Sequence, residues 1–531
     1  MPDTRRDFLR KVGIAGGAGV MYGTMAALGL VPAAAQAPDY VPPRAGDLNG
    51  RPRSVVVLGG GIAGLTAAYE LRKGGYKVTV LEARNRPGGR NWTVRGGTVE
   101  TDLKGITQAA RFSRGEYMNA GPARIPQHHV TLDYCRELGV PIEAFANQNA
   151  DAYLYREGPT ALSNTTVRHR TAKADVYGYV SELLAKATDQ GALDGYLTPS
   201  DKEALIDFLE DFGDIGPKVP GDAAASFRYT GSDRRGYATP PGAGLEEGIP
   251  LPPYPLSDVL ASGVGNYFSF EFEWDQAMMM FQPVGGMDRI PYAFEKAIGR
   301  DKIRYGAKVL GMRNTSSGVV VDYTGPGRKT RRLEADFAIC TLPPHIAAKV
   351  PGNLPAATTA ALEYAEPGDA GKMGIEYGRR WWELDHRIYG GITSTDTDLE
   401  NIWYPSSGYH GERGTLIGYY NQDEQARRFG ALHPDARLAR ALELGAQVHG
   451  PGYARDVQAA FSVDWASIEH SEGAWVDWPS QTDPRYKELL EPAGNIYFAG
   501  DHLSHTIGWQ HGAMVSARAT VTSLHRRVRE G

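Results

Sequence analysis

Three features of the sequence predict an α/β protein built around a parallel β-sheet. Residues 55–58, Val-Val-Val-Leu, form the short β-branched run expected of a strand that is buried on both faces. Helical periodicity follows over residues 62–71, and a second apolar strand is expected at residues 78–81. The chain has 531 residues, which is too many for one core, so we expect at least two domains.

The turn between the first strand and the helix predicts a Rossmann-like site for a dinucleotide. Gly59, Gly61 and Gly64 have G-x-G-x-x-G spacing. The first glycine permits a tight turn, the second permits close approach of a pyrophosphate, and the third permits close packing of helix on strand. Ile62 and Ala63 open the helix, where free backbone amides can bind phosphate.

The residues after the second strand specify the nucleotide further. Glu82 ends that strand, where its carboxylate can accept hydrogen bonds from both ribose hydroxyls of an adenine dinucleotide without a ribose phosphate. Ala83 and Arg84 follow it. Gly89 and Arg90 then belong to a Pro-Gly-Gly-Arg turn. The two guanidinium groups suit a second approach to the pyrophosphate.

With this turn after the dinucleotide motif, the sequence resembles the FAD-dependent, monoamine oxidase-like flavin amine oxidase superfamily. The resemblance implies FAD as the cofactor, an FAD/NAD(P)-binding domain and a mixed-sheet substrate-binding domain with a helical insertion, which is the amine oxidase fold. A covalent-flavin cysteine, found near the last strand of monoamine oxidases, is absent from residues 500–517. We therefore expect FAD to be bound noncovalently.

Composition limits the classes of partner. A hydrophobic content of 42% and a charged content of 22% are those of a soluble globular protein. The net charge of -5 gives no electrostatic reason to expect nucleic acid or an anionic membrane. Cys135 and Cys340 are the two cysteines, and both are expected to be buried thiols, although a disulfide between them stays open. We expect no metal cluster.

The first 37 residues are typical of a twin-arginine export signal. Arg5 and Arg6 are paired, residues 12–30 are mildly apolar, and residues 35–37 supply an A-x-A cleavage site. The alternatives are an amphipathic terminal helix and a membrane anchor. The signal predicts a bacterial protein that reaches the periplasm or the medium, and no other run is apolar enough to span a bilayer.

The chain order predicts discontinuous domains. We assign residues 53–126, 283–342 and 491–531 to the FAD-binding domain, residues 127–256 to a largely helical insertion, and residues 257–282 and 343–490 to the substrate-binding domain. Within this scheme, residues 267–275 alternate like a strand, and residues 318–323 and 335–341 are expected to form a meander.

Two side chains are candidate site residues from the local sequence. Arg124 lies in a short loop between Gly-Pro and Pro, which can fix its guanidinium to bind a planar carboxylate, and an ordinary surface arginine is equally compatible with that loop. Lys372 lies in an apolar strand, where burial is costly unless the amine binds a water or a cofactor atom. Spacing alone favours a lysine at a strand edge.

Within the superfamily, residues 53–523 resemble the L-amino-acid oxidases most. The landmarks are Gly-Pro-Ala-Arg-Ile-Pro at 121–126, Lys372, Trp-Tyr-Pro at 403–405, and Gly508-Trp509. The resemblance implies that Arg124 and Tyr404 hold the substrate carboxylate and that Lys372 positions a water near the reactive flavin nitrogen. It also implies that the Gly508 carbonyl accepts a hydrogen bond from the substrate amine, and that Trp509 forms one wall of the substrate pocket.

The same resemblance completes the cofactor site. The expected further contacts are Gly121, Pro122, Ala123, Arg124, Val309, Gly500, Asp501, Gly508 and Trp509. Val309 is expected beside the adenine, and Asp501 beside a ribityl hydroxyl, although the family commonly has Glu at that position. The helix after Trp509 can stabilise negative charge on the flavin.

The expected activity is oxidative deamination of L-amino acids. Hydride passes from the α-carbon to FAD, the imino acid hydrolyses to a 2-oxo acid and ammonia, and dioxygen is reduced to hydrogen peroxide. Alternatives are an amine or polyamine oxidase, a quinone-linked dehydrogenase, and a flavoprotein scaffold without catalysis. A homodimer is common in the resembling family.

Substrate preference stays open at the level of sequence. Glu271, Glu273 and Asp275 would suit a basic side chain, whereas Trp509 and the aromatics of residues 267–272 would suit a hydrophobic one. Gln510 and His511 can face the substrate or be ordinary helix residues, and ordinary helix residues are the expectation.

Overall fold

The computed structural model describes residues 40–48 and 52–530, with the side chains of residues 269–272 and 326 excepted. The expected export signal at residues 1–37 lies outside this part of the chain. The described chain forms two compact units. The larger comprises Val41–Pro159, Ser163–Thr166 and Ser269 onward, and the smaller consists mainly of Val167–Phe268.

A five-stranded parallel sheet forms the core of the larger unit. Its strands run in the order β13 (Ile303–Arg304), β2 (Lys77–Leu81), β1 (Ser54–Leu58), β17 (Phe337–Cys340) and β25 (Ile496–Phe498). Every neighbouring pair is parallel. The predicted α/β class is therefore confirmed, and the strand at residues 78–81 is β2.

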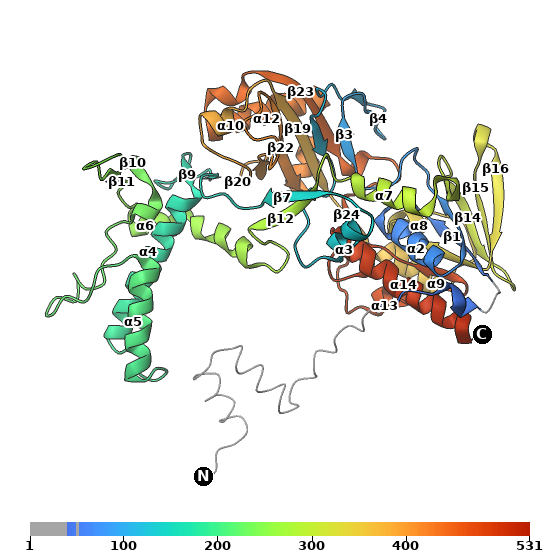
Figure 1. Cartoon of the computed structure of the whole chain (residues 1–531), viewed down its shortest axis with the longest axis horizontal. Helices are drawn as coiled ribbons and strands as arrows, with labels where there is room; N and C mark the ends of the chain where they lie inside the picture. The colour runs from blue at the N-terminus through green and yellow to red at the C-terminus, as the bar shows by residue number, and fades with distance from the viewer. Residues whose placement is uncertain (1–39, 49–51, 531) are drawn as a thin grey trace, which may run out of the picture. The chain divides into compact units, whose positions relative to one another are not determined.

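Helices cover one face of this sheet. The helix α2 (Ile62–Lys73) runs beside α14 (Gln510–Glu530) (Figure 1), and α7 (Arg289–Ile298) and α3 (Val130–Glu137) pack in the same layer. Because side chains alternate along a strand, Val55 and Val57 face these helices while Val56 and Leu58 face the opposite layer.

The opposite layer is an antiparallel sheet of β14 (Val309–Asn314), β15 (Val319–Thr324) and β16 (Thr330–Ala335). The expectation of a meander over residues 335–341 was wrong for its last strand. Residues 337–340 form β17, which pairs in parallel with β1 and β25, and all four of these residues are buried. Burial on both faces suits a central parallel strand better than a meander edge.

A mixed sheet forms a second core in the larger unit. Its strands include, in spatial order, β23 (Val457–Asp464), β19 (Ala370–Tyr377), β22 (Gly414–Gln422), β21 (Asn401–Trp403), β20 (Ile392–Thr395) and β8 (Tyr153–Tyr155). Only β20 and β8 among these pair in parallel. The helices α11 (Asp423–Gly430) and α12 (Pro434–His449) pack on β22 and β23.

The smaller unit is helical, with α4 (His169–Asp189) packed on α5 (Pro199–Gly213) and a short α6 (Leu256–Ser262). Residues 127–166, which we expected to belong to this insertion, include two strands of the larger unit. These are β7 (Ile142–Ala146), which pairs with β12 (Met279–Pro283), and β8. The expected strand over residues 267–275 was also wrong, because Val264–Phe272 is a 3-10 helix, η3.

The remaining elements are short: η1 (Ala45–Leu48), β3 (Thr93–Arg95), β4 (Val99–Thr101), β5 (Thr107–Ala109), β6 (Tyr117–Asn119), β9 (Thr166–Arg168), η2 (Asp233–Arg235), β10 (Tyr237–Thr239), β11 (Ile249–Pro250), η4 (Arg300–Lys302), η5 (Pro326–Arg328), α8 (Pro344–Ala347), α9 (Ala356–Tyr364), β18 (Glu366–Gly368), α10 (Trp381–Leu384), η6 (Pro451–Ala454), η7 (Trp465–Ser467), β24 (Trp475–Asp477), α13 (Pro484–Glu488) and η8 (Asp501–Leu503). Cys135 and Cys340 are buried and unpaired with each other. No helix within residues 40–48 and 52–530 is long and apolar enough to cross a bilayer.

Candidate active site

A cavity of about 460 Å³ opens at the carboxyl ends of β1 and β2 and continues to the mixed sheet. This volume is in the range of small-molecule and cofactor sites. Nearly all the predicted site residues line it: Gly59, Gly61, Ile62, Ala63, Glu82, Ala83, Arg84, Gly89, Arg90, Gly121, Pro122, Ala123, Arg124, Val309, Lys372, Gly500, Asp501, Gly508 and Trp509. The predicted residues outside its lining are Gly64 and Tyr404.

The glycines of the first turn have different physical roles. A β-carbon on Gly64 would lie 2.0 Å from the carbonyl oxygen of Gly59, so this glycine allows α2 to pack against β1. Gly61 has φ -72°, and a β-carbon added there would have no neighbouring protein atom within 4 Å. The protein itself therefore gives no reason for glycine at position 61. Because Gly61 lines the cavity at the uncapped start of α2, its missing side chain leaves room for a phosphate group.

Glu82 lies at the cavity wall immediately after β2. Its carboxylate is buried and accepts hydrogen bonds from the backbone N–H of Gly60 at 2.7 Å and of Arg84 at 2.8 Å. These bonds fix the carboxylate at the carboxyl edge of the parallel sheet. An acidic group held there fits the ribose-binding role expected from the sequence.

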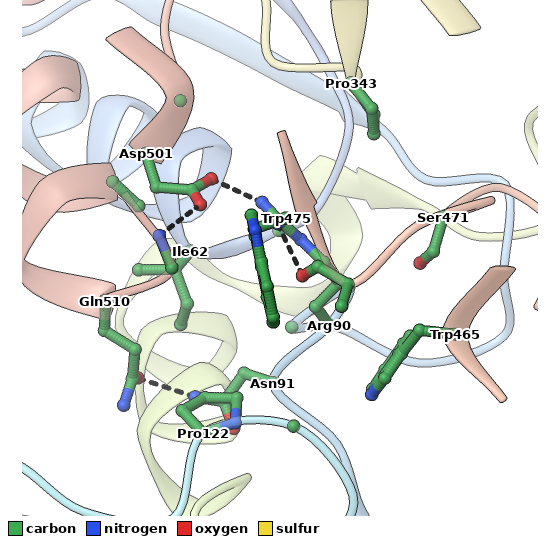
Figure 2. Close-up of a pocket in the computed structure, with 18 of the residues that line it drawn as sticks. Ile62, Arg90, Asn91, Pro122, Pro343, Trp465, Ser471, Trp475, Asp501 and Gln510 are labelled. Atoms are coloured by element: carbon green, nitrogen blue, oxygen red, sulfur yellow. Dashed lines mark hydrogen bonds and ion pairs between the residues drawn. The ribbon is translucent and has the colours of Figure 1, made fainter. Parts of the chain in front are cut away.

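The two arginines of the nucleotide motif are anchored to the chain segment before β24. Arg84 Nη2 donates to Ser471 Oγ at 3.0 Å, and Arg90 Nη1 donates to the carbonyl of Ala474 at 2.9 Å. Arg90 also forms an ion pair with Asp501 (Figure 2). Both guanidinium groups line the cavity, and their protein partners fix their positions.

Asp501 connects the nucleotide motif to the start of the last helix. Burial raises the pKa of this carboxyl, but Arg90, His502 and the backbone N–H of Gly508 more than offset burial, and the net pKa is below the ordinary value. The Gly508 N–H lies 3.1 Å from Asp501 Oδ2. Gln510, the first residue of α14, accepts a 2.6 Å hydrogen bond from Asn91 (Figure 2). Gln510 therefore contributes to the cavity wall and is more than an ordinary helix residue.

Arg124 lies at the other end of the cavity, among aromatic rings. Its guanidinium carbon is 4.7 Å from the ring centre of Trp403 and 5.9 Å from that of Trp509, and Nη1 donates to Asn147 Oδ1. Burial lowers the pKa of Arg124 to about 10, so it remains a cation at neutral pH. The surface-arginine alternative was wrong, because this side chain lines the cavity.

Lys372 lies in β19 beside Arg124. Its side chain is buried, and Nζ donates to the carbonyl of Gly121 at 2.6 Å. The ammonium is 4.5 Å from the ring centre of Tyr420 and 4.9 Å from that of Trp403. Burial and repulsion from Arg124 lower the pKa of Lys372 to about 7. The strand-edge alternative was wrong, since β19 pairs with strands on both sides.

The structure does not place Tyr404 in the cavity. Its side chain is 1% exposed, and its hydroxyl bonds to Thr393 Oγ1 at 2.7 Å and to His449 Nε2 inside the hydrophobic core. Trp403 lines the cavity instead. Consecutive side chains of an extended segment point to opposite faces, so only one of these two aromatics can face the cavity.

Several cavity residues were missed from the sequence: Gln276, Trp403, Tyr420, Gln422 and Trp465. Tyr420 is the partner of Lys372 in the pairing of β22 with β19, so the two share one face. That pairing joins residues far apart in the sequence.

Of the acidic residues expected to suit a basic substrate, Glu273 is exposed and Asp275 forms hydrogen bonds with histidines. The side chain of Glu271 lies outside the described residues.

The chain is similar in sequence to several L-amino-acid oxidases. An L-amino-acid oxidase of Vipera ammodytes ammodytes is 25% identical over 499 residues, covering 90% of this chain and 93% of the relative. An L-amino-acid oxidase of Notechis scutatus scutatus is 26% identical over 488 residues, covering 90% and 87%.

Solved structures share the fold. Cyclohexylamine oxidase from Brevibacterium oxydans IH-35A matches with a TM-score of 0.60 at 19% identity, covering 90% of this chain and 99% of that one. Wild-type putrescine oxidase bound to putrescine matches with a TM-score of 0.58 at 20% identity, covering 89% and 98%. The family model described as flavin containing amine oxidoreductase matches residues 62–525. The chain therefore belongs to the flavin-containing amine oxidase family.

Proposed function

We propose that this protein oxidises L-amino acids to 2-oxo acids with a noncovalently bound FAD. The observation that carries the proposal is the charged guanidinium of Arg124, which is half-buried and lines the cavity beside Lys372. Two basic groups at one end of a cavity favour an anionic ligand, and a guanidinium matches the planar carboxylate of an amino acid. The L-amino-acid oxidases among the relatives support the same assignment.

FAD fits the residues at the opposite end. Gly61 and the start of α2 would hold the pyrophosphate, Glu82 the adenosine ribose, and Asp501 the ribityl chain. When bound, FAD supplies the acceptor for the hydride that leaves the α-carbon of the substrate. Noncovalent binding is supported by the position of both cysteines, since neither Cys135 nor Cys340 lines the cavity.

The residues of this chain position the substrate. Arg124, stacked on Trp403, would bind the carboxylate, and Trp509 would bound the space for the rest of the substrate. Lys372, with its lowered pKa, can hold a water as a hydrogen-bond acceptor in its neutral form. No protein base is needed if the substrate amine arrives neutral. The Gly508 carbonyl remains the proposed acceptor for that amine.

The second candidate is an amine or polyamine oxidase, favoured by the fold shared with cyclohexylamine and putrescine oxidases. These amines carry no carboxylate, so such a substrate would offer Arg124 no anionic partner. Losing the charge-assisted hydrogen bonds between a guanidinium and a carboxylate costs several kcal/mol, about a hundredfold or more in discrimination. Arg124 is therefore the residue that separates the two candidates.

The proposal has three further parts: dioxygen is the electron acceptor, a twin-arginine signal exports the protein, and the protein forms a homodimer. Hydrogen peroxide release would distinguish an oxidase from a quinone-linked dehydrogenase. Cleavage after residue 37 in the periplasmic or secreted fraction would support export. The mass of the purified holoenzyme in solution would test the dimer.

The direct test is anaerobic reduction of the bound flavin by three matched sets of compounds. These are L-amino acids, their D-enantiomers and their decarboxylated amines. We expect bleaching of flavin absorbance by L-amino acids only. Bleaching by the amines would establish the second candidate, and absence of bleaching by every compound would favour a flavoprotein scaffold without catalysis.

A further inference from the structure

Two histidines and an aspartate form a cluster beside the cavity, outside the groups assigned above. Oδ1 of Asp275 lies 2.6 Å from Nε2 of His129 and 3.1 Å from Nε2 of His128. One ligand-type atom from each residue lies within 4.8 Å of the others. Two imidazoles and one carboxylate are a ligand set typical of Zn²⁺ and neighbouring transition metals.

The chain segments that carry the cluster are joined by backbone hydrogen bonds. His128 and His129 directly precede α3, and Asp275 lies between η3 and β12. The backbones of Ile125 and Phe281 exchange two hydrogen bonds, of 2.7 and 2.9 Å. Because this bridge lies close to both ligand-bearing segments, it holds the three side chains in reach of one another before any ligand binds.

Aromatic rings support the histidines from outside the cluster. The ring of His129 stacks on His511 at 4.4 Å and meets the edge of Trp509 at 5.2 Å. The ring of His128 lies 4.3 Å from Trp274. Nδ1 of His511 accepts a hydrogen bond from the Val130 backbone N–H, which holds this ring beside His129.

The exposure of the cluster suits a cation. The His129 side chain is 2% exposed, whereas His128 and Asp275 are 26% and 21% exposed, which leaves a path for an ion and a bound water.

We propose that His128, His129 and Asp275 bind one Zn²⁺-class cation, with water completing a tetrahedral shell. In such a shell, neighbouring ligand atoms lie about 3.3 Å apart, so the partly exposed His128 needs only a small rotation. The cation would tie the segment before β12 to the start of α3. Gln276 follows Asp275 and lines the cavity, so the metal would fix part of the cavity wall.

Zn²⁺ binding can be tested separately from the proposed function, because none of its three ligands lines the cavity. The two cysteines offered no reason to expect a metal. The histidine pair is contiguous, but its aspartate lies 146 residues from His129 along the chain, so only the fold brings the three together.

The test is equilibrium dialysis of tag-free, chelator-treated holoenzyme against Zn²⁺, with elemental analysis. We expect one saturable Zn²⁺ per chain in the wild type. His128→Gln and Asp275→Asn should each weaken binding by about tenfold or more. The matched control is His433→Gln, which removes an exposed histidine 3.4 Å from Asp435 and should leave the affinity unchanged.

Two results would overturn the proposal: no saturable Zn²⁺ in the wild type, or equal affinity in the wild type and both ligand variants. The flavin content of each variant reports whether it has folded. X-ray absorption at the zinc edge of the wild type supplies a readout that needs no variant. It should show two imidazole ligands, and a spectrum without imidazole scattering would contradict the assignment.

Discussion

The two ends of the cavity are built in different ways. At the nucleotide end, Gly61, Glu82 and Arg90 come from one continuous stretch of the chain, and backbone amides make several of the contacts. At the substrate end, Arg124 and Lys372 come from a loop and a strand far apart in sequence, and Lys372 reaches the loop through the Gly121 carbonyl. The first end is a local motif, whereas the second depends on how distant strands pair.

Because of this difference, the two ends of the cavity tolerate different changes in sequence. The nucleotide end needs fixed backbone geometry, because the turn and the start of α2 would bind the proposed cofactor through N–H groups. The substrate end needs a side chain on the correct face of a strand. There, replacing one residue can change the ligand without disturbing the fold.

The largest expected effect comes from the substrate end. Arg124→Gln keeps a shorter polar side chain but removes the charge, so kcat/KM for L-amino acids should fall by about a hundredfold or more. The flavin absorbance spectrum should stay unchanged, and steady-state kinetics on holoenzyme with equal flavin content provides the measurement. Kinetics like those of the wild type would remove Arg124 from the substrate site.

Lys372 should give the next largest effect, through pH. Its folded pKa of about 7 lies below the ordinary 10.5, so between these values the unfolded chain binds more protons and the free energy of unfolding rises with pH. Below pH 7 both states are protonated and the full cost of burying the cation is present. Lys372→Met should remove this dependence, a change of about 2–4 kcal/mol.

The measurement is the thermal midpoint of wild type and Lys372→Met at several pH values from 6 to 10. The difference between the two proteins should narrow as pH rises, with the variant more stable at the acidic end. A constant difference across that range would mean that Lys372 keeps an ordinary pKa, and the proposed neutral amine would be abandoned.

Gly61 tests whether the nucleotide end is shaped by a ligand. Gly61→Ala should weaken flavin retention by about tenfold because its methyl group would occupy the space left for a phosphate, while the apoprotein keeps its stability. Gly64→Ala is the contrasting variant, since its β-carbon would meet the Gly59 carbonyl and cost about 1–3 kcal/mol in folding. Flavin content and apoprotein melting separate these outcomes, and equal flavin retention in wild type and Gly61→Ala would refute the phosphate assignment.

Tyr404 should give the smallest effect. Tyr404→Phe removes a buried hydroxyl and should cost about 1 kcal/mol of stability while changing KM by less than about threefold. Trp403→Leu should raise KM more, because it removes the ring on which Arg124 stacks. If Tyr404→Phe raised KM more than Trp403→Leu, the assignment of Trp403 to the cavity and of Tyr404 to the core would be contradicted.

Much of the parallel sheet could be predicted because its signals are local. The apolar run of β1, the glycines and Glu82 lie within one short stretch, and each has a single physical reason to occur there. The last strand before Asp501 was found from the same kind of apolar run. Sequence alone misplaced residues 337–340, because strand order depends on pairing between distant segments.

The errors at the substrate end have the same origin. An adjacent Trp and Tyr carry no local sign of which one faces a cavity, so Trp403 was missed and Tyr404 misplaced. Alternating apolar and polar residues predicted a strand at residues 267–275, but Val264–Phe272 forms η3. Period-two alternation over a short segment does not exclude a tight helix.

The most direct test of the central claim is whether Arg124 binds a carboxylate. An unreactive aromatic carboxylate such as benzoate would be titrated into the wild-type holoenzyme and the Arg124→Gln holoenzyme, with the flavin difference spectrum as the readout. We predict saturable binding to the wild type and an affinity about a hundredfold weaker in the variant. Equal affinity in the two proteins would contradict the assignment of this site to amino-acid oxidation.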